Sequence, residues 1–248
     1  MTVLLRVDAS ARIDRSITRQ MGDRFVDGWR SAEPDAGLIH RDVGRQPPSL
    51  VNEASISAGF TPADERTPEM VETLAESAVL IEEVRRADVL VLGAPLYNYG
   101  LPASLKAWID QIVRPGETFS FDLRRGDFPI RSTLSGKTLV VLTSRGEFGF
   151  EPGGLRDGWN HLNPHLRTVA TRLLGIAEED IHEIASEYQE FGDERHRSSR
   201  QQALHDASEL GSRLATARRA RVAQVNGHTT NPASTPTSTQ EPCDALTK

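Results

Sequence analysis

Two uninterrupted apolar runs place the strongest limit on how this chain can fold. Residues 88–93 read DVLVLG and residues 138–143 read TLVVLT. Strands that show no alternation of polar and apolar residues are buried on both faces, which is typical of parallel sheets covered by helices. The two runs therefore predict central strands of a parallel sheet.

Weaker strand signals alternate with amphipathic segments along the rest of the chain. Further strands are expected at 3–7, 38–43 and 181–184, the last of them a short edge strand. Helical signals occupy five other segments, 16–30, 67–84, 102–113, 163–174 and 195–221. Five strands that alternate with helices predict an α/β fold, a doubly wound five-stranded parallel sheet with helices on both faces.

The composition excludes several classes of protein. Among 248 residues, 38% are hydrophobic, so a sizeable core can be buried. The net charge of -6 leaves no basic excess for binding nucleic acid.

The one cysteine, Cys243, fits a reducing compartment and allows neither an internal disulfide nor a cysteine-rich metal site. No signal-peptide core and no apolar stretch of about 18 residues occurs, so we expect a cytoplasmic protein without a membrane span.

The chain divides into a globular part and a polar tail. Residues 1–225 carry the strand and helix signals, whereas residues 226–248 read NGHTTNPASTPTSTQEPCDALTK and contain almost no large apolar side chain. Such a segment buries too little surface to offset its ordering entropy. We therefore expect one folded domain over 1–225 and a disordered tail over 226–248.

Three loops follow the strands at the places where a doubly wound sheet binds its ligand. Ligands bind beyond the carboxyl ends of the strands, where the strand order reverses. The loops to consider are residues 8–18, 95–99 and 144–147. The sequence predicts that they meet at one edge of the sheet.

The first loop joins a strand to the start of a helix. Free backbone N–H groups and the helix dipole favour a phosphate there, and the hydroxyl groups of Ser10, Ser16 and Thr18 add donors. Glycine is absent, so this is not the GxGxxG loop of dinucleotide-binding proteins. Ser16 also fits the role of a plain helix cap, and the two roles are compatible.

The other two loops suit a planar ligand. Pro95–Leu96–Tyr97–Asn98–Tyr99 offers aromatic faces and an amide, and Ser144–Arg145–Gly146–Glu147 offers donors beside a glycine that allows close backbone approach. Each motif alone also fits an ordinary turn. Their position after two buried strands favours the ligand site.

Together the loops resemble a known family, the flavodoxin-like FMN-dependent NADH azoreductases and quinone reductases, over roughly residues 3–215. Residues 94–99 (APLYNY) resemble the family's APMYNF segment, residues 143–146 (TSRG) resemble its TSRGG loop, and residues 118–121 (TFSF) resemble its TFRY segment. The resemblance implies a flavodoxin-like fold and an FMN-dependent oxidoreductase. Such an enzyme transfers hydride from NADH or NADPH through the flavin to quinones or azo compounds.

The resemblance also assigns roles to residues. It implies that FMN is bound by thirteen residues, Ser10, Ser16, Ile17, Thr18, Pro95, Leu96, Tyr97, Asn98, Tyr99, Ser144, Arg145, Gly146 and Glu147. Phe121 is expected on the substrate side. The family further implies a ping-pong mechanism and a homodimer with its active sites at the interface. No catalytic acid–base pair and no metal ligand is assigned.

The sequence departs from the family at the site itself. Leu96 replaces a methionine, Tyr99 a phenylalanine and Glu147 the second glycine of the third loop. We therefore expect Glu147 to place an acid near the flavin ring. Residues 122–135 also diverge, and they are expected to shape a different substrate opening.

Other functions fit the sequence less well. A flavodoxin-like electron carrier or a flavin-binding module without nicotinamide turnover is the main alternative. Gly136–Lys137–Thr138 resembles the end of a Walker A loop, but it precedes a strand instead of a helix. His161 and His165 have metal-ligand spacing, but Pro164 lies between them and no HExxH pattern is present.

Overall fold

A five-stranded parallel sheet forms the centre of the molecule. The computed structural model describes the backbone of residues 1–228 and side chains as far as Arg221. The sheet has the order β2-β1-β3-β6-β7, and every neighbouring pair is parallel. Its strands are β1 (Val3–Asp8), β2 (Gly37–Asp42), β3 (Val89–Gly93), β6 (Thr138–Ser144) and β7 (Ile181–Ser186). The predicted doubly wound sheet is confirmed, and β7 is the expected edge strand.

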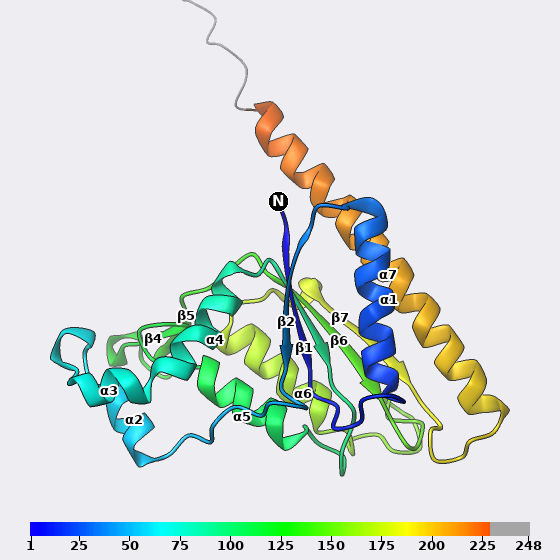
Figure 1. Ribbon diagram of the computed structural model, residues 1–248, viewed down its shortest axis with the longest axis horizontal. Helices are drawn as coiled ribbons and strands as arrows, with labels where there is room; N and C mark the ends of the chain where they lie inside the picture. Colours follow the sequence, from blue (N-terminus) through cyan, green and yellow to red (C-terminus); the bar gives the residue numbers. More distant parts are fainter. Residues whose placement is uncertain (229–248) are drawn as a thin grey trace, which may run out of the picture.

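Helices cover both faces of the sheet. One face carries α1 (Ile17–Ala32) and α7 (Glu194–His228), and Figure 1 shows the two side by side. The other face carries α4 (Ala75–Arg86), α5 (Ala103–Ile112) and α6 (Leu162–Thr168), and α6 continues as a π-helix over Val169–Leu173. The remaining elements are α2 (Glu53–Phe60), α3 (Pro68–Thr73), β4 (Phe119–Phe121), β5 (Ile130–Ser132) and three short 3-10 turns at Ala63–Glu65, Leu123–Arg125 and Glu178–Asp180.

The apolar runs supply two separate cores. In β3, Val89 and Val91 lie in the core against α1 and α7, whereas Leu90 and Leu92 lie in the core against α4, α5 and α6. A strand that contributes side chains to both cores has no polar face, because successive side chains point to opposite sides of the sheet. This burial explains the uninterrupted apolar sequence.

Helices α1 and α7 approach each other through two glycines. A Cβ atom built on Gly28 of α1 would lie 2.1 Å from the carbonyl oxygen of Ser208 in α7. A Cβ atom on Gly211 of α7 would lie 2.3 Å from the carbonyl oxygen of Phe25 in α1. Only glycine allows this backbone contact, so the two helices are fixed at close range.

Two parts of the chain differ from the sequence prediction. The helix expected over 67–84 is divided at Leu74 into α3 and α4, where Leu74 has φ -91° and ψ 0° and its N–H is shared between the Met70 and Val71 carbonyl oxygens. The predicted cap at Thr67 is confirmed, since its side chain accepts from the Met70 N–H. The segment around Phe119 is the first strand of an antiparallel β4–β5 hairpin whose second strand was not predicted.

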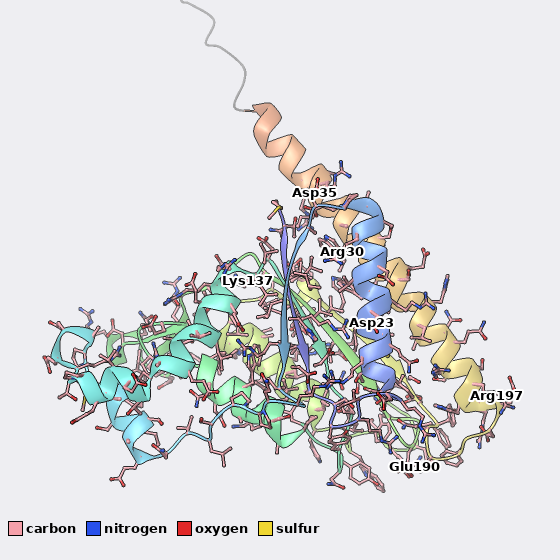
Figure 2. All side chains as sticks on the ribbon, in the orientation of Figure 1. Asp23, Arg30, Asp35, Lys137, Glu190 and Arg197 are labelled. Carbon is pink, nitrogen blue, oxygen red and sulfur yellow. The ribbon has the colours of Figure 1, made fainter. Side chains whose placement is uncertain are left out.

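The two edges of the sheet are clearly separated. Figure 2 shows Lys137, which precedes β6, at the upper edge and Glu190, which follows β7, at the lower edge. The carboxyl ends of the strands and the start of α1 lie at the lower edge (Figure 1). The site predicted from the three loops belongs at this edge.

The C-terminal helix extends past the predicted end of the folded domain. The backbone of α7 reaches His228 and therefore includes residues 226–228, which the sequence placed in the tail. Residues 229–248 lie outside the described part of the chain, and the prediction of a disordered tail falls there. Within residues 1–228, every helix is too short or too polar to cross a membrane.

Candidate functional site

A cavity of about 280 Å³ lies at the carboxyl edge of the sheet, and we call it the strand-end cavity. All three predicted loops contribute to it. Its wall consists of Ser10, Arg12, Arg15, Ser16, Ile17, Pro95, Leu96, Tyr97, Ser144, Gly146, Gln189 and Glu190. Eight of the thirteen residues predicted to bind FMN are therefore brought together.

The first loop presents hydrogen-bond donors at the start of α1. Ser16 is the N-cap of this helix, and its hydroxyl accepts from the Arg19 N–H and lies 3.2 Å from the Thr18 hydroxyl. The capping role expected for Ser16 is thus confirmed. The N–H groups of Ile17 and Thr18 belong to the first helical turn, which has no intrahelical acceptor for them. Ile17 lies in the cavity wall whereas Thr18 is fully buried, so the Ile17 N–H is the one that an anion at this end of the helix can reach.

One arginine holds this loop in shape. Arg19 donates from Nε to the Arg12 carbonyl oxygen at 3.0 Å and from Nη2 to the Ser10 carbonyl oxygen at 2.9 Å. Its two terminal nitrogens also bond both carboxylate oxygens of Asp42, at 2.6 and 2.7 Å. Burial by itself raises the pKa of Asp42, but hydrogen bonds from Arg19 and the Arg45 N–H outweigh it, so the pKa lies below its usual range.

A buried charge network supports Arg19 from below. Asp8, at the end of β1, is 1% exposed and lies 3.0 Å from Arg6, 3.5 Å from Arg19 and 2.8 Å from the His40 ring nitrogen. Burial alone lowers the pKa of Arg6, but the charges of Asp8 and Asp23 outweigh it and the pKa is raised. The sequence signal for this network was two charged residues inside an apolar strand.

The second loop is tied to the other two. The Leu96 N–H donates to the Ser144 carbonyl oxygen at 2.9 Å, and the Ala11 N–H donates to the Tyr97 hydroxyl at 3.3 Å. Asn98 and Tyr99 have positive φ angles of 48° and 64°, which non-glycine residues seldom adopt. These bonds fix the relative positions of all three loops.

Two predicted FMN-binding side chains bond to each other outside the cavity. The Tyr99 hydroxyl donates to Glu147 Oε2 at 3.0 Å, and Arg156 binds the other carboxylate oxygen. Arg156 is the largest cause of the lowered pKa of Glu147, and the bond to Glu147 raises the pKa of Tyr99. The acid expected beside the ring is therefore already paired with an arginine.

Three further predicted residues also lie outside the cavity wall. Arg145 pairs with Glu187 at 3.1 Å and lies over the Phe150 ring, and Thr18 is fully buried behind Ser16. Asn98 is exposed and lines no part of the cavity. Phe121, predicted on the substrate side, lies on the β4–β5 hairpin and is 56% exposed.

Glu190 is the carboxylate that does face the cavity. A Cβ atom on Gly146 would lie 2.5 Å from Glu190 Oε1, so the absence of a side chain at Gly146 makes room for it. Glu190 is in no ion pair with another described residue. Sequence reasoning missed Arg12, Arg15, Gln189 and Glu190, the last two because the loop after the fifth strand was not considered.

The donor set fits a flavin mononucleotide. Hydroxyl and N–H donors at the start of α1 suit a phosphate, and Pro95, Leu96 and Tyr97 give an apolar wall for a planar ring. Among the side chains described up to Arg221, no three His, Cys, Asp or Glu residues are grouped to hold a metal ion.

Known proteins share both this sequence and this fold. The model of the flavodoxin-like fold family matches residues 2–210. An FMN-dependent NADH:quinone oxidoreductase 2 of Idiomarina loihiensis is 51% identical over 86% of this chain and 91% of that protein. An FMN-dependent NAD(P)H:quinone oxidoreductase 1 of Pseudomonas aeruginosa is 43% identical over 77% of this chain and 90% of that protein.

Solved structures extend the comparison of the fold. A Bacillus anthracis azoreductase superposes with a TM-score of 0.75 at 19% identity, covering 86% of this chain and all of the other. A second azoreductase structure from that species, in complex with FMN, gives a TM-score of 0.74 and covers 87% of this chain and 100% of that one. With the sheet order, the three loops and the matched residues in agreement, the chain belongs to the family with the flavodoxin-like fold.

Proposed function

We propose that this protein is an FMN-dependent oxidoreductase that passes hydride from NADH or NADPH to quinones or azo compounds. The observation that carries this proposal is the meeting of all three loops in the strand-end cavity. Relatives named as FMN-dependent NADH and NAD(P)H:quinone oxidoreductases, at 51% and 43% identity, support it. The azoreductase fold supports the second acceptor class.

The first loop holds the cofactor's phosphate, and the other two loops hold its ring. Ser10, Ser16 and the N–H groups of Ile17 and Thr18 face the phosphate. Pro95, Leu96, Tyr97, Asn98 and Tyr99 lie along one side of the ring, and Ser144, Arg145, Gly146 and Glu147 lie along another. Bound FMN supplies the reversible hydride acceptor, and the chain supplies binding and orientation.

We also propose an oligomeric state and a cellular compartment for the protein. The β4–β5 hairpin exposes Phe121, Leu123, Phe128 and Ile130, and this apolar surface suits burial against a second copy of the chain. We therefore propose a homodimer with Phe121 on its substrate side. Light scattering of the purified protein checks the dimer. The lone cysteine fits a reducing compartment, so we place the protein in the cytoplasm.

An absorbance spectrum tests the proposed function. Purified protein mixed with FMN should show a bound-flavin spectrum that bleaches within seconds of adding NADH without oxygen. Flavin that stays oxidised until a separate reductase is added would favour an electron carrier. Protein that binds no FMN would exclude both functions.

NADH and the acceptor are expected to use one opening in turn. No GxGxxG loop exists to seat the nicotinamide separately, so it must reach the ring over Leu96 and Tyr97, where the acceptor also enters. Initial rates at several acceptor concentrations should give parallel double-reciprocal lines. Intersecting lines would mean that both substrates bind together and would exclude a shared opening.

Ser16→Ala is expected to weaken FMN binding about ten-fold or more. The substitution removes one hydrogen bond to a charged phosphate, which contributes roughly 1.5–3 kcal/mol. Titration of the apoprotein with FMN measures the effect. Because alanine also removes the helix cap, Ser16→Asp is the matched variant. Aspartate caps as well as serine does, so stability should hold, but its charge repels phosphate. Unchanged FMN affinity in both variants would contradict the assignment.

A further inference from the structure

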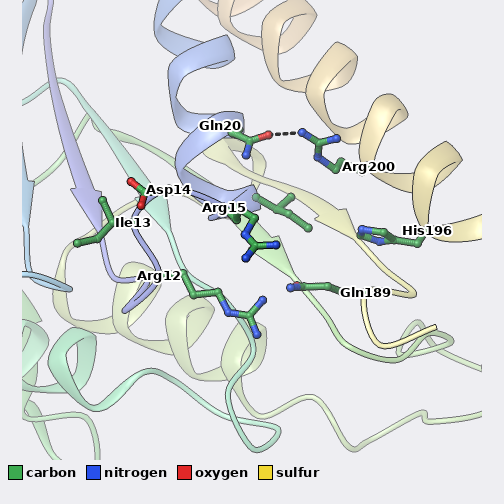
Figure 3. A pocket seen from close by; sticks show the side chains of 9 residues that line it. Arg12, Ile13, Asp14, Arg15, Gln20, Gln189, His196 and Arg200 are labelled. Carbon is green, nitrogen blue, oxygen red and sulfur yellow. Dashed lines mark hydrogen bonds between the residues drawn. The ribbon is translucent and has the colours of Figure 1, made fainter. Parts of the chain in front are cut away.

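A second cavity, of about 780 Å³, adjoins the strand-end cavity. It lies between the start of α1 and the start of α7, as Figure 3 shows. The two cavities share four wall residues, Arg12, Arg15, Ile17 and Gln189, so they are continuous. We call the second one the arginine pocket, after Arg12, Arg15 and Arg200.

The arginine pocket carries positive charge that the described residues leave unpaired. Arg12, Arg15 and Arg200 form no ion pair within residues 1–221, and Asp14 is the one carboxylate in the wall. Arg200 donates to the side-chain oxygen of Gln20 at 2.5 Å, a contact that orients the guanidinium group without neutralising it. Three cations against Asp14, with Glu190 the carboxylate of the adjoining strand-end cavity, leave a positive excess that indicates an anionic ligand.

The phosphate of FMN does not account for the whole pocket. Its donors lie at Ser10, Ser16 and the first turn of α1, in the strand-end cavity. Arg200, Gln20 and His196 line the arginine pocket alone. A ligand that reaches these residues must carry negative charge beyond the flavin site and still have a part that reaches the ring.

A nicotinamide dinucleotide meets both conditions. Its nicotinamide reaches the flavin ring, and its pyrophosphate and adenosine extend away from it. The sequence has no glycine-rich loop to bind that pyrophosphate. Quinones and azo compounds need carry no phosphate, so the acceptor does not require these arginines.

We infer that the arginine pocket binds the adenosine diphosphate half of NADH or NADPH, with Arg15 and Arg200 bonding the phosphates. This inference rests on the proposed function. Arg12 and Arg15 lie at the junction with the strand-end cavity, whereas Arg200 is the residue whose role is specific to the donor. The pocket thus fixes the far end of the donor and leaves the nicotinamide end over the ring.

The test compares two electron donors in the FMN-loaded protein. NADH carries the adenosine diphosphate group, and N-benzyl-dihydronicotinamide does not. Arg200→Gln should raise the KM for NADH about ten-fold, the loss of one charged hydrogen bond, and Arg200→Glu should raise it further. Both variants should keep the wild-type kcat/KM for the benzyl donor and the wild-type affinity for FMN.

Arg197 provides the matched control. It lies three residues earlier on α7 (Figure 2). Arg197 pairs with Glu194 and lines neither cavity. Arg197→Gln should leave the KM for both donors unchanged. Equal effects of Arg200→Gln on the two donors, or none on either, would overturn the inference.

Binding of ADP alone separates the inference from the proposed function. By calorimetry, ADP should bind the FMN-loaded protein without displacing FMN, and Arg200→Glu should abolish this binding. ADP that displaces FMN would assign the pocket to the flavin and overturn the inference, as would no binding at all. If neither donor reduced the flavin, the proposed function would fail, and ADP binding would still decide whether the pocket takes an adenosine diphosphate group.

Discussion

Arg19→Ala is expected to lower the free energy of unfolding by about 3–5 kcal/mol and to remove tight FMN binding. The side chain is 11% exposed and pairs with Asp42, which is 18% exposed. Removing Arg19 leaves Asp42 with the more distant Arg45, at 3.6 Å, and takes one of its two arginines from the buried Asp8, and breaking a largely buried pair has a cost of this size. The carbonyl oxygens of Ser10 and Arg12 also lose their donor, so the loop that faces the phosphate loses its shape.

Chemical denaturation of the apoprotein measures the stability change, and titration with FMN measures the binding. Arg19→Lys separates the two effects, because lysine keeps the charge but cannot bond both carbonyl oxygens and both carboxylate oxygens at once. It should recover most of the stability and little of the FMN affinity. Arg41→Ala is the control, since Arg41 pairs with Glu83 away from the loop. FMN affinity that survives Arg19→Ala would contradict the role of Arg19.

The same pair makes stability depend on pH. The pKa of Asp42 is lowered in the folded protein, so its contribution to stability is fully present above the unfolded-state pKa and is lost as pH falls through the folded-state pKa. The unfolded-state pKa of an aspartate is about 3.9. The stability difference between the wild type and Arg19→Ala should therefore narrow below about pH 4.

Gly28→Ala is expected to lower the free energy of unfolding by about 3 kcal/mol, the upper end for an overpacked core. The new Cβ atom would lie 2.1 Å from a backbone oxygen of α7, and backbone cannot move aside as a side chain does. The melting temperature should fall by roughly 2–4 °C for each kcal/mol lost.

Gly59→Ala is the matched control for this substitution. Gly59 also lies in a helix, but its nearest neighbour would be 3.8 Å from the new Cβ atom. Alanine there should be neutral or stabilising by up to about 1 kcal/mol. If Gly28→Ala had the same melting temperature as the wild type, α1 and α7 would not approach as closely as described.

The sheet and the position of the site could be predicted because burial on both faces leaves a local mark in the sequence. Residues 89–92 and 139–142 are apolar without interruption for that reason, and a parallel sheet then fixes where the following loops lie. The cap at Ser16 is equally local, since it depends on residues within one helical turn.

The structural features that the sequence did not predict depend on contacts between residues far apart in the chain. Where the predicted helix divides, the Leu74 carbonyl oxygen accepts from Arg114, which lies forty residues later in the chain. The bonds of Glu147 to Tyr99 and Arg156 were not predicted, because no sequence pattern links the three residues. Glu190 follows the last strand without any motif and reaches the cavity because Gly146 leaves space for it.

The charge network beneath the first loop also limits how this sequence can diverge. The buried Asp8 pairs with both Arg6 and Arg19, and Arg19 also pairs with Asp42, so the loss of one residue weakens the charge balance of the others. Substitution of one of these residues alone gives a strongly destabilised protein. We therefore expect these positions to change together or not at all. Over evolutionary time, β1 and the start of α1 should therefore change more slowly than the mostly exposed helices α2 and α3.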